Sequence, residues 1–183
     1  NKTDWFYTPQ IIHFNGVDII ELERISNISS LRDLLELEIA IESNVLTKVG
    51  KALAIFHKEL AIIDKQNCVH GDFNIINVAY QYDTARIIVF DWCLNPALSN
   101  SRQYSRLLDM ASFLRAILLQ LTSLKRPSML WRQRSVQFLS AYEQEACEKI
   151  DYSSLWAWLR FLQLRCMLKQ FKQRKFISLL NLS

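Results

Sequence analysis

The eight residues from His70 to Asn77 read HGDFNIIN, and fourteen residues after Asn77 an apolar run delivers Asp91. Between them, two apolar segments flank a short polar turn at Gln81–Thr84, which predicts two strands joined as a hairpin. A hairpin returns the chain to the end of the sheet where it started. Asn77 and Asp91 are therefore expected to lie close together.

The residue types in this stretch suit phosphoryl transfer. His70, Asp72 and Asn77 fit the spacing H-x-D-x-x-x-x-N of a kinase catalytic loop. Such a reaction needs a carboxylate that positions a hydroxyl and receives its proton, a role that suits Asp72. It also needs Mg²⁺, which takes oxygen ligands such as those of Asn77 and Asp91. The alternative is that Asp72 and Asn77 only form turns, as these residue types often do.

In these residues the chain resembles the aminoglycoside phosphotransferase and choline kinase branch of the protein-kinase-like superfamily, with His-Gly-Asp at 70–72 and Asp-Trp at 91–92. The resemblance implies ATP and Mg²⁺ as cofactors and a hydroxyl of a small molecule as acceptor: a sugar, an aminoglycoside-like compound or an amino alcohol. It implies Asp72 as the base, with His70 bracing the same loop through hydrogen bonds. Asn77 and Asp91 are the implied metal ligands.

The resemblance extends over roughly residues 10 to 145. Residues 49–57 resemble the family's helix before the catalytic loop, and residues 108–111 resemble the helix behind that loop. Residues 138–142 resemble a late helix of the same lobe, and residues 20–25 resemble the hinge between the two lobes. At the hinge, the backbone of Glu23, Arg24 and Ile25 is the implied contact for adenine. Residues 1–28 are then a remnant of the small lobe with the hinge, and residues 29–183 are the large lobe with a basic C-terminal helix.

The sequence departs from the family in its phosphate-binding elements. It contains only three glycines, so no Gly-rich loop can be written, and no lysine in a strand precedes the hinge. The small lobe either lies in a longer protein or has been lost, and we expect these residues alone to bind ATP poorly. The alternative function is a non-catalytic, kinase-like binding module that acts through a partner.

Hydrophobic patterning predicts an α+β fold in which helix predominates. Asn15-Gly16 separates two apolar runs and indicates a first hairpin. Five helices are expected at 31–39, 43–64, 105–123, 131–146 and 155–180, the first of them capped by Ser29 or Ser30. Gly50 falls inside the second helix and costs some helix propensity.

Composition favours one compact domain, since 50% of the residues are hydrophobic and 22% are charged. No apolar run reaches the ~18 residues of a membrane span. The four scattered cysteines suggest reduced thiols and a cytoplasmic protein. Asp109, on an apolar helix, is expected to be a buried acceptor, and His13 and His57 are expected to fill space in the core or on the surface.

The tail from Tyr152 to Ser183 holds six basic residues and no acidic ones. Its apolar residues form a helical stripe (Leu155, Trp158, Leu162, then Phe161, Leu164, Leu168, Phe171) that is expected to pack on the rest of the chain. Weak contact with an anionic surface is the alternative role for this helix, and no specific nucleic-acid partner is expected.

Overall fold

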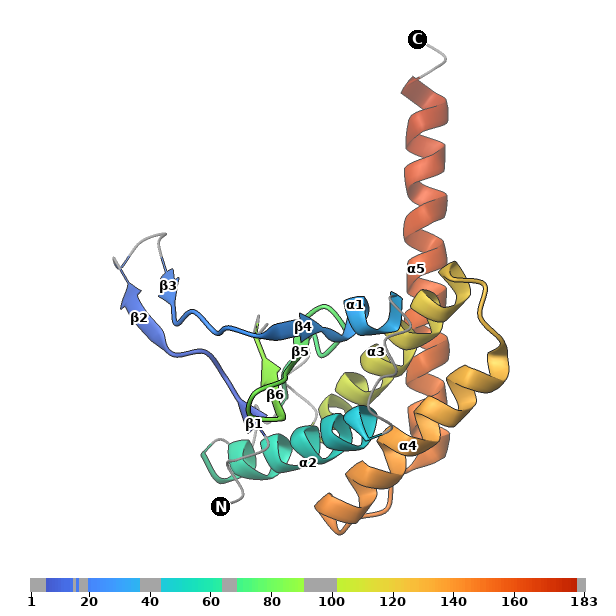
Figure 1. The fold of residues 1–183 in the computed structure, drawn as a ribbon. Helices are drawn as coiled ribbons and strands as arrows, with labels where there is room; N and C mark the ends of the chain where they lie inside the picture. The colour runs from blue at the N-terminus through green and yellow to red at the C-terminus, as the bar shows by residue number, and fades with distance from the viewer. Residues whose placement is uncertain are drawn as a thin grey trace.

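The computed structural model describes residues 6–14, 16, 20–36, 44–63, 69–90 and 102–180. The α+β fold that the sequence predicts is confirmed, with helix predominating (Figure 1). The strands are β1 Phe6–Tyr7, β2 Ile11–Phe14, β3 Ile20–Leu22, β4 Ile28–Ser30, β5 Val78–Gln81 and β6 Arg86–Val89. The helices are α1 Leu31–Glu36, α2 Val45–Ile63, α3 Arg102–Ser123, α4 Ser128–Ala146 and α5 Tyr152–Leu180.

The central sheet has the strand order β1-β6-β5-β4. Its middle pair, β5 and β6, is the hairpin predicted from the polar turn, with Val78 opposite Val89. The two outer strands were not predicted: β4 pairs with β5 in antiparallel fashion, and β1 pairs with β6 in parallel. Both are only two or three residues long, which leaves too little sequence to show an alternating pattern.

The hairpin predicted around Gly16 is also confirmed. Strands β2 and β3 pair in antiparallel fashion as a separate two-stranded sheet, and Gly16 adopts a φ of 83°, which glycine tolerates without strain. In Figure 1 this hairpin reaches away from the rest of the molecule and continues through residues 23–27 into β4. Ile11 and Ile12 are both 64% exposed, so the hairpin buries little of its own apolar surface.

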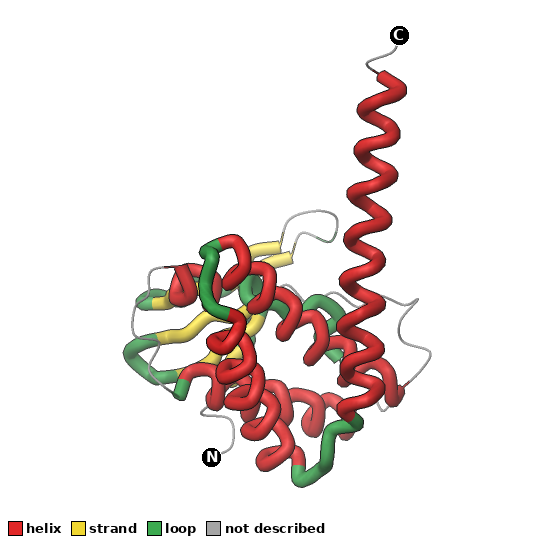
Figure 2. The backbone as a smooth tube through the Cα atoms, turned by 90° about the vertical axis from the view of Figure 1, so that its right-hand side faces the viewer, coloured by secondary structure: helices red, strands yellow, loops and turns green. Residues whose placement is uncertain are grey.

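One cluster of buried hydrophobic side chains extends from Leu31 to Leu159 and joins all five helices to β5 and β6. Helix α2 packs on α4, and α3 packs on α5. At the start of α1, the Ser30 hydroxyl accepts a hydrogen bond from the Asp33 N–H at 3.1 Å, which confirms the predicted cap. Figure 2 shows helices around the strands and α5 extending past the rest of the chain.

Packing of the basic helix α5 agrees with the prediction only in its first turns. Leu155 and Leu159 are buried, and Trp158 and Leu162 pack against the core. The second half of the predicted stripe is wrong where it can be checked, because Phe161 is 51% exposed and Leu164 is 59% exposed. At 3.6 residues per turn, Phe161 and Leu164 lie on a different face of the helix from Leu155, Leu159 and Leu162, which face the core.

The close crossing of α2 and α4 explains the glycine inside α2. A Cβ atom at Gly50 would lie 2.3 Å from the carbonyl oxygen of Phe138 and 3.2 Å from the Cβ of Ala141. Glycine therefore lets the two helices approach at this point. The propensity cost of about 1 kcal/mol is offset by this contact.

We expect Gly50→Ala to lower the free energy of unfolding by roughly 2–3 kcal/mol, because α4 must move to admit one methyl group. Chemical denaturation measures this change. Lys58→Ala, at an exposed position of the same helix, is the control and should stay within about 0.5 kcal/mol of the parent protein. Stabilisation by Gly50→Ala, the usual result at an open helix position, would contradict the close crossing.

Candidate functional site

The loop from His70 to Asn77 is held at its start by a carboxylate from α3. Asp109 is 1% exposed, and it accepts hydrogen bonds from the N–H of His70 at 2.7 Å and of Gly71 at 2.9 Å. Gly71 has a φ of 86°, a conformation that a residue with a side chain adopts only with strain. The prediction that Asp109 is a buried acceptor is confirmed.

The side chain of His70 ties the loop to the end of β6. It is fully buried, its Nδ1 accepts a hydrogen bond from the Asp72 N–H at 3.3 Å, and its Nε2 lies 3.1 Å from the carbonyl oxygen of Phe90. Since a carbonyl only accepts, Nε2 carries the proton and donates it. Both ring nitrogens are thereby occupied, which is the bracing role expected of this residue.

The second half of the loop is built by two asparagines. The Oδ1 of Asn74 accepts from the Ile76 N–H at 2.8 Å, and its Nδ2 donates to the carbonyl oxygen of Asp72 at 3.2 Å. The Nδ2 of Asn77 donates to that same carbonyl at 3.0 Å and to the Asp72 Oδ2 at 3.2 Å. The loop is thus closed on itself around Asp72.

These contacts fix which end of the Asn77 amide faces Asp72. A carbonyl and a carboxylate only accept hydrogen bonds, so the NH₂ group must face them. The Oδ1 of Asn77 is left free of a donor among the described residues. An amide oxygen without a donor is suited to a hard cation.

Asp72 is exposed, and its neighbour Asn77 is buried at the end of the sheet. The Phe90 N–H donates to the Asn77 carbonyl at 3.1 Å, so the hairpin does bring the two chain segments to one end of the sheet. Asp91 follows Phe90 directly and lies outside the described residues. Its role as a metal ligand stays a prediction.

His57 was expected only to fill space in the core or on the surface, and this interpretation missed its contacts. It is 1% exposed on α2, with its Nε2 3.1 Å from the Asp109 Oδ2 and its Nδ1 2.9 Å from the Tyr142 hydroxyl of α4. A neutral ring explains both: the Tyr142 hydroxyl donates to Nδ1, and Nε2–H donates to Asp109. Asp109 was the sequence signal that could have indicated this role for His57, because a buried carboxylate needs hydrogen-bond donors from other segments.

Burial lowers the pKa of His57, although Asp109 acts in the opposite direction. In the unfolded chain, the His57 side chain takes up a proton as the pH falls below the ordinary histidine pKa of about 6.5. In the folded protein, His57 stays neutral down to a lower pH. We expect the contribution of His57 to the free energy of unfolding to be constant above about pH 6.5. The free energy of unfolding should fall as the pH is lowered below this value. Urea titrations at pH values on both sides measure the change, and His57→Gln should reduce the slope. An equal slope in parent and variant would contradict a neutral His57.

Within the described residues, no three or more His, Cys, Asp or Glu side chains form a group able to hold a metal. A magnesium ion at this loop would instead use Asn77, one carboxylate and phosphate oxygens, which is the usual way Mg²⁺ is held beside a nucleotide. The donor set of the loop fits such an ion.

The predicted adenine contacts lie apart from the loop. Glu23, Arg24 and Ile25 follow β3 and lead toward β4 (Figure 1). The Glu23 carboxylate accepts hydrogen bonds from the Tyr7 hydroxyl and from the Gln10 N–H, and its own N–H donates to the Gln10 carbonyl at 2.8 Å. These bonds stabilise the base of the β2–β3 hairpin. Adenine contact by the three residues stays a prediction.

A cavity of about 730 Å³ lies beside the loop. Gly71, Asp72 and residues 74–76 form one wall. The other walls come from Arg32 of α1, from α3 between Leu108 and Ser123, and from Leu162 and Arg165 of α5. Asp72 is therefore exposed toward a space large enough for a small organic molecule.

No protein-family model and no curated protein sequence matches this chain. Within the residues described, none of the helices combines the length and the hydropathy that a transmembrane segment requires.

Proposed function

We propose that this chain carries the catalytic loop of a phosphotransferase that uses ATP and Mg²⁺ to phosphorylate a hydroxyl of a small molecule. The observation that carries the proposal is the orientation of Asn77. Its NH₂ group holds Asp72 while its oxygen is free of a donor among the described residues, so one loop offers both a base and a metal ligand. A pair of turn-forming residues needs neither feature.

In the proposed reaction, the acceptor hydroxyl loses its proton to Asp72 as its oxygen bonds to the γ-phosphorus of ATP. The bond from that phosphorus to the bridging oxygen breaks, and ADP leaves with the electron pair. Asn77 and Asp91 would hold Mg²⁺, which would supply charge neutralisation on the phosphates. Asp109 and His70 keep the loop in place during this step.

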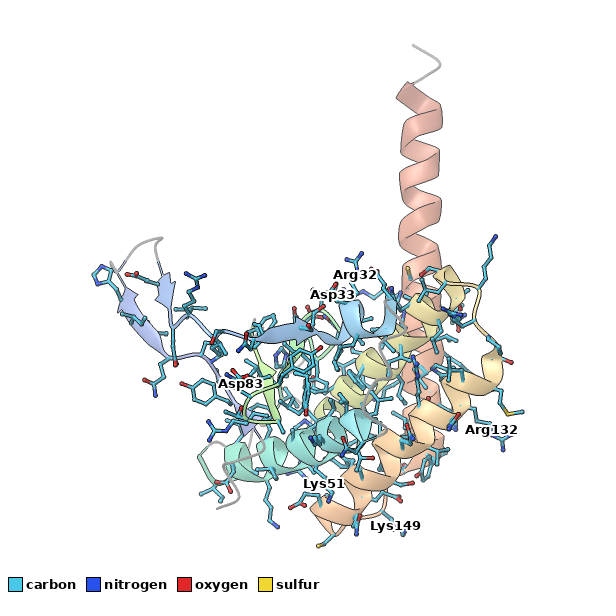
Figure 3. All side chains as sticks on the ribbon, in the orientation of Figure 1. Arg32, Asp33, Lys51, Asp83, Arg132 and Lys149 are labelled. Carbon is cyan, nitrogen blue, oxygen red and sulfur yellow. The ribbon has the colours of Figure 1, made fainter. Side chains whose placement is uncertain are left out.

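Asp91→Ala in the full-length protein should weaken binding of Mg-ATP by about 10-fold or more, because a carboxylate ligand of the ion is lost. Binding of ATP in the presence of a chelator should change little. Calorimetric titrations with and without Mg²⁺ measure both. Asp83→Ala is the control, an exposed carboxylate near the far turn of the β5–β6 hairpin (Figure 3). Equal losses with and without Mg²⁺ would mean that Asp91 only supports the fold.

The second candidate is a non-catalytic binding module, and α5 is the observation that favours it. Trp156, Phe161 and Leu164 are each about half exposed on this helix, which also carries Arg160 and Arg165. Such a surface suits a protein partner. A protein of this kind needs no free carboxylate at residue 72, so substitution there separates the two functions.

A further inference from the structure

We infer that the acceptor carries a negatively charged group, such as a phosphate or a carboxylate, which Arg115 and Arg165 bind in the cavity beside Asp72. The inference rests on the proposed function and narrows its acceptor class.

The first step is the position of the cavity. Asp72, the proposed base, lines it together with the arginines of three different helices: Arg32 of α1, Arg115 of α3 and Arg165 of α5. Helix α5 packs on α3, which brings the last two to the same space. When an acceptor places its hydroxyl at Asp72, the rest of the molecule therefore lies near these guanidinium groups.

The second step is the balance of charge. Among the described residues that line the cavity, Asp72 is the one carboxylate, and three arginines line the same space. Arg32 is partly neutralised, because its Nε lies 3.1 Å from Glu36, whose same oxygen also accepts from Gln120 at 2.8 Å. For Arg115 and Arg165, no hydrogen-bond or ion-pair partner exists within the described residues. These two can bind an anion without first breaking a contact.

The third step is the chemistry of the group that fits. Guanidinium groups bind phosphate and carboxylate through paired hydrogen bonds, which position an acceptor as well as attract it. A cationic amine would meet Arg115 and Arg165 with the same sign of charge. This disfavours the aminoglycoside-like and amino-alcohol acceptors that the family resemblance suggests. Leu108, Leu119 and Leu162 line the rest of the cavity and suit the carbon skeleton of the acceptor.

The test measures binding without nucleotide, so it does not depend on turnover. The chain is titrated with a hexose phosphate, with the same hexose unmodified and with the corresponding hexosamine. The hexose phosphate should bind at least about 10-fold more tightly than the other two. Arg115→Gln and Arg165→Gln should each weaken its binding by about 10-fold. Arg132→Gln should leave binding unchanged, because Arg132 projects from α4 and does not line the cavity (Figure 3).

Similar affinities for the three compounds, tighter binding of the hexosamine, or an equal loss in Arg132→Gln would overturn the inference. Competition by Mg-ATP would also overturn it, since the arginines would then hold the nucleotide, but the proposed function would stand. Conversely, unchanged turnover in Asp72→Asn with arginine-dependent binding retained would remove the proposed function and keep the anion site. Arg115 is partly exposed and Arg165 is exposed, and circular dichroism checks that the variants stay folded.

Discussion

Asp72→Asn should reduce the rate of phosphoryl transfer by about 1,000-fold in the full-length protein. The change keeps the size of the side chain and removes the group that receives the proton. The carbonyl of residue 72, to which Asn74 and Asn77 donate, is not altered, so the loop keeps most of its hydrogen bonds. Stability should therefore change little, and the loss should appear in kcat.

Steady-state assays with Mg-ATP and a panel of hydroxyl compounds measure this loss. Asp83→Asn is the matched control: it makes the same chemical change at an exposed position near the hairpin turn, where it alters a bond to Asn27. Its rate should equal that of the parent protein. Turnover by Asp72→Asn at the parental rate would remove this carboxylate from the mechanism.

Asp109→Ala should lower the free energy of unfolding by about 3–5 kcal/mol, the largest stability effect that we expect. Its carboxylate accepts from two backbone N–H groups of the loop and from His57, and all three donors would be left without this acceptor. Asp109 and His57 are 1% exposed, so water cannot replace the lost bonds without opening the core.

Urea denaturation monitored by circular dichroism gives this free energy, with Asp33→Ala as control. Asp33 is exposed in the first turn of α1, where a carboxylate contributes less than about 1 kcal/mol. A loss of similar size in both variants would contradict the central position of Asp109. Asp109→Asn should lie between the parent and Asp109→Ala, because its one oxygen can serve only part of the three donors.

The sequence predicted the loop and its surroundings well because their signals are local. The alternation of apolar runs around a polar turn indicated β5 and β6, and the serine before Leu31 indicated the start of α1. The spacing from His70 to Asn77 placed the loop directly before β5. Each of these features depends on residues that are neighbours in the chain.

What could not be predicted depends on contacts between distant segments. His57 and Asp109 are 52 residues apart, and no local pattern shows that they meet. The reason for Gly50 became visible only with Phe138 of α4 beside it. Likewise, Arg115 and Arg165 face one cavity because α3 and α5 pack together, and a helical pattern alone does not give that pairing.

The most direct test of the central claim is ³¹P NMR of the full-length protein with Mg-ATP and hydroxyl acceptors of anionic, neutral and cationic type. We expect a new phosphate-ester resonance that grows as ATP is converted to ADP, that requires Mg²⁺ and that is strongest with the anionic acceptor. Bound Mg-ATP without ester formation on any acceptor would contradict the assignment of the loop from His70 to Asn77 as a phosphoryl-transfer site.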